Sequence, residues 1–114
     1  MIKNLIVFHG SNLNINNQIK EFENILSKQT DKSFSICFLK SSPNLKDELI
    51  ISAKEHFSEI NILPLFLLPG NHLSYEIPNI VKEFNKTFPD IAVNINNYLA
   101  SDNIFIKYIA NKLK

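Results

Sequence analysis

Four short apolar runs alternate with four amphipathic segments along this 114-residue chain. The runs are rich in β-branched and aromatic residues, as buried strands are, and they occupy residues 5–8, 34–39, 60–67 and 91–95. The segments repeat apolar residues at helical spacing, and they occupy residues 14–28, 42–57, 74–88 and 102–113. Strands that alternate with helices pair through crossover connections. The order βαβαβαβα therefore predicts an α/β fold, with a four-stranded parallel sheet and helices on both faces.

Composition places the chain among ordinary globular proteins and predicts a single domain, residues 1–114. The net charge is +1, which gives no sign of a nucleic-acid or membrane-surface partner. The N-terminal apolar run is too short for a signal peptide, and no apolar run is long enough to span a membrane. With one cysteine, Cys37, no intramolecular disulfide or cysteine-based zinc site can form. We therefore expect a cytoplasmic protein.

Several residues next to the expected helices have the chemistry of helix starts. Asn12 or Asn14 is suited to cap the first helix, and Ser101 or Asp102 the fourth. Pro78 is expected in or near the first turn of the third helix, where the missing N–H of proline does no harm.

Three side chains with site chemistry follow expected strands. His9 directly follows the first run, Lys40 directly follows the second, and His72 lies in the expected loop after the third. In an open parallel sheet the carboxyl ends of the strands share one edge, where ligands bind. Two neutral imidazoles at one edge suit a divalent metal, and two protein ligands leave coordination positions open for transfer or catalysis. Glu76 is a candidate third ligand if the helix begins early enough for positions 72 and 76 to share a face.

Each of these residues also has an ordinary structural interpretation. A single histidine after a strand is usually a loop or cap residue, and Gly10 and Gly70 are expected in turns that need positive φ. Ser11 is more often a helix cap than a nucleophile. His56 suits the end of the second helix, where a cation is favoured, and Cys37 suits a buried strand. Nucleotide-binding glycine motifs are absent from the sequence.

Two segments together carry a resemblance to a known family. They are VFHGSN at residues 7–12 and LPLFLLPGNHLSYEIP at residues 63–78. The chain resembles the small, single-domain sirohydrochlorin chelatases of the CbiX type over essentially its whole length. Those proteins have a hydrophobic strand that ends in H-G-S and a P-L-F-L-x-x-G-x-H-x-x-x-[DE]-I-P segment.

The resemblance implies a chelatase fold and a homodimer. It also implies insertion of Co²⁺ or Fe²⁺, or Ni²⁺ in some relatives, into sirohydrochlorin or a related tetrapyrrole without nucleotide hydrolysis. The divalent metal is then a substrate, and no cofactor is permanently bound. The family's metal-binding histidines match His9 and His72. Backbone N–H groups around Gly10, Ser11, Gly70 and Asn71 are candidates for binding the carboxylates of the tetrapyrrole.

The sequence departs from the family pattern at three positions. Lys40 stands where the family usually has a glutamate, Asn12 where it has an arginine, and Asn71 where it has a glycine. A protonated lysine cannot ligate a metal. We therefore favour a contact between the flexible Lys40 side chain and a substrate carboxylate; the alternative is that the missing glutamate removes a proton acceptor and slows the reaction.

Two other functions stay open from the sequence. The first is a non-catalytic relative that binds metal or tetrapyrrole and delivers it. The second is a flavodoxin-like interaction domain with incidental histidines.

Overall fold

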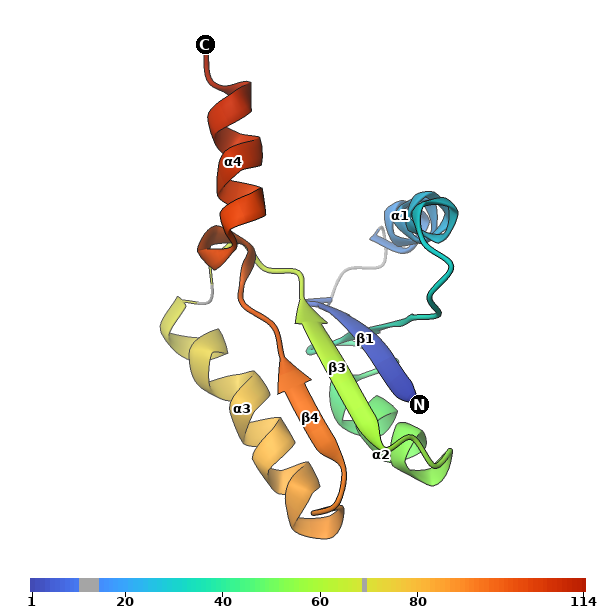
Figure 1. Ribbon diagram of the computed structural model, residues 1–114. Helices are drawn as coiled ribbons and strands as arrows, with labels where there is room; N and C mark the ends of the chain where they lie inside the picture. The colour runs from blue at the N-terminus through green and yellow to red at the C-terminus, as the bar shows by residue number, and fades with distance from the viewer. Residues whose placement is uncertain (11–14, 69) are drawn as a thin grey trace.

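The computed structural model describes residues 1–10, 15–68 and 70–114, without the side chains of residues 15–16 and 71–73. Strands and helices alternate as the sequence predicted, and a short 3₁₀ helix precedes the last α-helix (Figure 1). The elements are β1 (Ile2–Phe8), α1 (Ile15–Gln29), β2 (Ser35–Phe38), α2 (Leu45–Lys54), β3 (Glu59–Pro64), α3 (Gly70–Thr87), β4 (Ala92–Ile95), η1 (Leu99–Ser101) and α4 (Asn103–Lys112).

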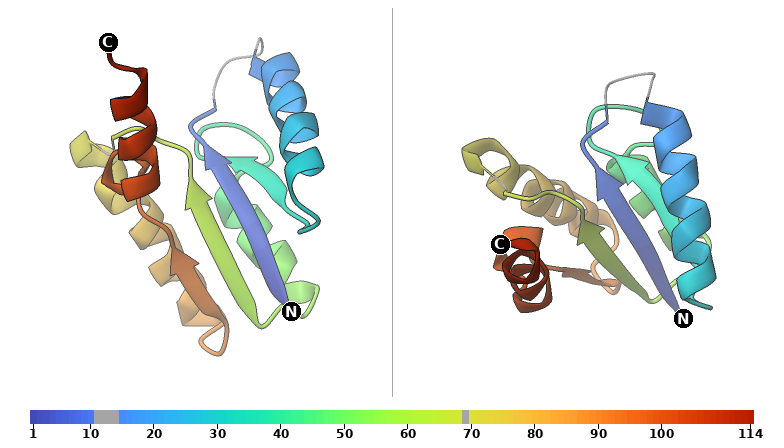
Figure 2. Two further views of the ribbon diagram at one scale, coloured as in Figure 1. Left: turned by 45° about the horizontal axis from the view of Figure 1, so that its top comes forward. Right: turned by 90° about the horizontal axis from the view of Figure 1, so that it is seen from above.

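The four strands form one parallel sheet in the order β2-β1-β3-β4. Helix α1 lies on one face of this sheet, and α2 and α3 lie on the other (Figure 2). The predicted fold class, a four-stranded parallel sheet with helices on both faces, is confirmed.

The core lies on the α2 and α3 side of the sheet. Alternate residues of β3 point there, so Ile60, Ile62 and Pro64 are buried while Asn61 between them is not. The strands meet the apolar stripes of α2 and α3 in one cluster, whose most buried members are Leu5, Val7, Cys37, Leu45, Leu49, Ile60, Ile62 and Ile77.

The opposite face of the sheet is covered unevenly. Over β1, the ring of Phe8 packs edge-on against Phe22 of α1, with 5.6 Å between ring centroids. Over β3 and β4 the sheet instead carries a row of asparagines. Asn61 Nδ2 donates to Asn4 Oδ1 (3.0 Å), and Asn61 Oδ1 accepts from Asn94 Nδ2 (2.9 Å). This polar row lies where a helix would otherwise bury apolar side chains.

Helix α4 extends beyond the edge of the sheet, away from the strands (Figure 1). Its start is capped by Asp102, whose carboxylate accepts from the backbone N–H groups of Ile104 and Phe105. None of its residues is buried, and it packs mainly against η1. The exposed apolar side chains of this segment are Ile104, Ile106, Tyr108, Ile109 and Leu113.

Two expected boundaries near the third strand are wrong. β3 ends at Pro64 rather than at residue 67. The N–H of Leu65 still donates to Val7 O, but the carbonyl groups of Phe66 and Leu67 accept from the backbone N–H groups of Leu99 and Ala100 in η1 instead of from a strand. Leu67 and Leu68 are exposed rather than buried. α3 begins at Gly70 rather than at residue 74, so Pro78 lies inside the helix and not in its first turn. Pro78 is exposed, which keeps its ring away from the core.

Of the helices in the described part of the chain, none combines the length and apolar character needed to cross a membrane.

Candidate functional site

The order of the strands identifies one candidate ligand-binding position on the carboxyl edge of the sheet. β1 connects to β2 on one side, whereas β3 connects to β4 on the other. The crevice where such connections diverge is where open α/β sheets bind ligands. Here that crevice lies between the ends of β1 and β3, which His9 and residues 65–68 follow.

His9 is exposed at this crevice. Its ring meets the ring of Phe66 edge-on, with 6.5 Å between centroids, and Phe66 is itself buried. His9 Nδ1 lies 3.3 Å from the carbonyl oxygen of Gly10. When Nδ1 carries the proton, it donates to that carbonyl and leaves the Nε2 lone pair for a metal. The sequence did not single out Phe66, which helps to orient the imidazole.

Gly10 and Gly70 both adopt positive φ, as expected for turn residues, at +85° and +63°. At Gly10 there is also no room for a side chain. An added Cβ would lie 2.9 Å from the Cβ of Phe38 and would collide with Ser41 Oγ. At Gly70 an added Cβ would meet nothing within 4 Å, so only the backbone conformation favours glycine there.

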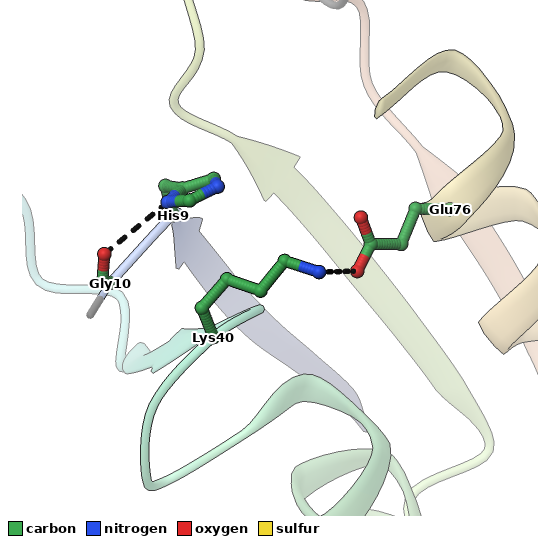
Figure 3. Close-up of polar contacts among 4 residues, drawn as sticks. All are labelled: His9, Gly10, Lys40 and Glu76. Carbon is green, nitrogen blue, oxygen red and sulfur yellow. Dashed lines mark hydrogen bonds and ion pairs between the residues drawn. The ribbon is translucent and has the colours of Figure 1, made fainter. Parts of the chain in front are cut away.

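Lys40 lies beside His9 because the hydrogen bonds between β1 and β2 continue past the strand ends. The backbone N–H of Leu39 donates to Phe8 O, and that of Lys40 donates to His9 O at 2.9 Å. The Lys40 side chain extends toward α3, where Nζ lies 3.0 Å from Glu76 Oε1 (Figure 3). Lys40 therefore connects the loop after β2 to α3 across the proposed binding edge.

The early start of α3 places positions 72 and 76 on one helix, four residues apart, so they share a face. His72 was expected in a loop; its backbone lies instead in the first turn of α3. Its side chain, the side chain of Asn71 and the whole of Ser11 lie outside the described part of the chain. The pairing of His9 with His72 on one ion therefore stays a prediction.

Glu76 was expected as a third metal ligand, and here its carboxylate accepts from Lys40. Among the described side chains, no three His, Cys, Asp or Glu residues gather in a way that could hold a metal.

Two other candidates lie away from this edge. Cys37 is fully buried in the core, and burial, followed by the nearby charge of Glu48, raises the pKa of its thiol to about 12. Its interpretation as a small buried hydrophobic residue is confirmed. His56 follows α2 with φ of +67°, and its N–H donates to Ala53 O. Because α2 begins near the carboxyl ends of the strands, His56 lies at the opposite edge of the sheet.

A groove of about 650 Å³ lies between α2 and α3. It is mainly apolar and contains neither histidine nor cysteine; its lining residues are Lys46, Ile50, Lys54, Asn79, Ile80, Glu83, Phe84, Thr87 and Phe88. The residues suited to metal chemistry are therefore elsewhere, at the ends of β1 and β3.

Comparison with known proteins identifies the family of the chain. The sequence model of the CbiX family matches residues 3–114. The chain belongs to the CbiX family. It is 23% identical to the chloroplastic sirohydrochlorin ferrochelatase of Arabidopsis thaliana over 113 residues, which is 96% of this chain and 50% of that protein.

Solved structures show the same fold at low sequence identity. A putative cobalamin biosynthesis CbiX protein from Marinobacter aquaeolei superposes with a TM-score of 0.75 at 15% identity, over 97% of this chain and 92% of that one. The cobalt complex of the sirohydrochlorin chelatase SirB from Bacillus subtilis subspecies spizizenii gives 0.78 at 20% identity, over 96% and 48%. This CbiX-family chain thus spans about half the length of the plant relative and of SirB.

Proposed function

We propose that this chain inserts a divalent metal into sirohydrochlorin or a related tetrapyrrole. The observation that carries the proposal is the position of His9, exposed at the crevice between β1 and β3, in a chain matched by the CbiX family from residue 3 to residue 114. The names of the plant relative and of SirB support sirohydrochlorin as the substrate.

The metal is a substrate in this reaction, with Co²⁺ and Fe²⁺ as the first candidates and Ni²⁺ as a third. We propose that His9 and His72 bind it. Two imidazoles leave coordination positions open, so the ion can pass to the pyrrole nitrogens. The macrocycle loses two protons as it takes the metal, and an imidazole freed of metal can accept one. This chemistry needs no nucleotide, and we propose that none is hydrolysed and that no cofactor is permanently bound.

The carboxylates of the tetrapyrrole need donors at the same edge. We propose backbone N–H groups around Gly10, Ser11, Gly70 and Asn71, close to the starts of α1 and α3, where the helix dipole favours negative charge. Lys40 is a further candidate, because its ammonium lies at this edge and remains partly exposed beside Glu76.

We also propose that the chain works as a homodimer. The exposed apolar side chains of α4 support an additional packing partner. The chain's length, about half that of SirB, supports a second copy as that partner. A cytoplasmic location stays a prediction.

Absorption spectroscopy of sirohydrochlorin with Co²⁺, Fe²⁺ or Ni²⁺ tests the proposed function. We expect many turnovers per chain with at least one metal, without ATP, and a loss of at least about 100-fold in rate in His9→Ala. His56→Ala, at the opposite edge of the sheet, is the matched control and should retain the rate. A spectral change that saturates at one equivalent would instead indicate a protein that delivers its ligand, and no change with any metal would contradict both functions.

A further inference from the structure

The ion pair between Lys40 and Glu76 joins two elements that are distant in sequence and meet at the proposed metal edge. Lys40 Nζ lies 3.0 Å from Glu76 Oε1, with 40% of the lysine side chain and 18% of the glutamate side chain exposed. Figure 3 shows the lysine extended toward α3, with His9 at the end of β1 beside it. The carboxylate is thus the more buried partner, and the ammonium can leave toward solvent.

Glu76 is suited to a second role at the same place. It lies four residues after His72 on α3, so the two positions share one face of the helix. A carboxylate oxygen is a good ligand for a divalent ion, whereas a lysine ammonium has no lone pair to offer. A divalent ion that reaches Glu76 therefore competes with Lys40 for the carboxylate, because the two cations repel each other at short distance.

We propose that Lys40 is an internal competitor of the metal substrate for Glu76, and that it thereby weakens and tunes metal binding. Lys40 is a positioning residue in this scheme, because it acts through Glu76 and does not touch the ion. The inference rests on the proposed function only in that the metal binds at this edge. Weaker binding suits a protein that must release its ion to a macrocycle.

Isothermal titration with Co²⁺ alone, without tetrapyrrole, tests the competition. Lys40→Met keeps the apolar stem and removes the charge, and we expect it to tighten Co²⁺ binding by about tenfold. Lys40→Arg keeps both charge and pairing and should stay within about threefold of the natural protein. Lys86→Met is the matched control, because Lys86 pairs with Glu83 farther along α3 in an exposed pair, and it should leave Co²⁺ affinity unchanged.

A double-mutant cycle separates competition from simple repulsion between charges. If Lys40 acts through Glu76, Lys40→Met should tighten binding by less than about threefold in a Glu76→Gln background. The proposal is overturned if Lys40→Met changes Co²⁺ affinity by less than threefold, if the full gain persists in Glu76→Gln, or if no variant binds Co²⁺. Thermal unfolding of each variant checks the fold, and Lys40→Gln replaces Lys40→Met if the latter is unstable.

Failure of this inference is distinguishable from failure of the proposed function. Co²⁺ titration reports the competition even if sirohydrochlorin is never metallated. Conversely, metal insertion into sirohydrochlorin can proceed at full rate even if Co²⁺ affinity is unchanged by substitution of Lys40.

Discussion

Helices α3 and α4 both follow a strand of the sheet and both carry an apolar stripe, yet only α3 buries it. Ile77 and Phe84 of α3 are 0% and 7% exposed, whereas Ile104 of α4 is 80% exposed. α3 lies along the sheet, while α4 extends past its edge (Figure 1). An amphipathic pattern therefore predicts that a helix has an apolar face, but it does not predict which surface will cover that face.

The surfaces opposite the two helices explain part of this difference. α3 faces the side of β3 that presents Ile60 and Ile62. The other side of β3 presents Asn61, whose amide group is occupied by Asn4, Asn94 and Asn96. Covering these amides with an apolar helix would bury polar groups and would gain little from the hydrophobic effect.

The largest expected effect concerns the core beneath α3. Ile77→Ala removes a fully buried side chain and should lower the free energy of unfolding by about 3 kcal/mol, through lost burial and the cavity left behind. Ile104→Ala on α4 should change it by less than about 0.5 kcal/mol at monomer concentrations. Urea denaturation followed by circular dichroism measures both. Equal losses would show that α4 is packed as tightly as α3 in solution.

The next effect concerns the partner proposed for α4. Ile109→Glu introduces a charge into the exposed apolar surface of α4. It should weaken dimerisation by about 100-fold, since a charge that is buried at the interface without a partner is costly. Analytical ultracentrifugation of the natural protein and of the Ile109→Glu variant measures the change in the dimer dissociation constant. Lys107→Glu on the same helix controls for charge alone. A natural protein that is monomeric at all concentrations would contradict the proposed role of α4.

A smaller effect concerns the single thiol in the covered core. Folding raises the pKa of Cys37 from the usual 9.0 to about 12, so above pH 9 the unfolded chain releases a proton that the folded chain keeps. Stability should therefore fall by about 1.4 kcal/mol from this group as pH rises from 10 to 11. The Cys37→Ala variant should lack this contribution when both proteins are unfolded in urea across that range. An identical pH slope in the two would place the thiol in contact with water.

Thiol reactivity compares the buried core with the exposed helix α4. Cys37 should react with a thiol reagent at neutral pH only when the protein unfolds, because the neutral, buried thiol is a poor nucleophile. A cysteine introduced by Ile106→Cys on exposed α4 should react within minutes.

The smallest effect concerns the helix caps. Asp102→Ala removes the acceptor for two N–H groups at the start of α4 and should cost that helix about 1 kcal/mol. Asn44→Ala at the start of the packed helix α2 should cost a similar amount, but from global stability. Hydrogen exchange should therefore show faster exchange confined to α4 in the first variant and faster exchange throughout the core in the second. Global destabilisation by Asp102→Ala would show that α4 unfolds together with the sheet.

Much of the fold was predictable because its signals are local. The strand and helix alternation, the cap at Asp102 and the turn glycines follow from side-chain spacing and backbone preference. The position of His9 at the carboxyl edge followed from the same alternation. The start of α3 was predicted four residues late, because the Gly-Asn dipeptide at its start resembles a turn and hides the first helical residues.

The sequence by itself determined which residues form strands, which form helices and which strand ends carry site chemistry, since these depend on neighbours a few positions apart. Only the tertiary structure decided that Lys40 meets Glu76, that Phe66 packs against His9, and that α4 leaves its apolar side chains exposed. Those outcomes depend on how separate elements approach one another. The strand order brings the loop after β2 and the start of α3 to one edge, and spacing along the chain carries no information about that distance.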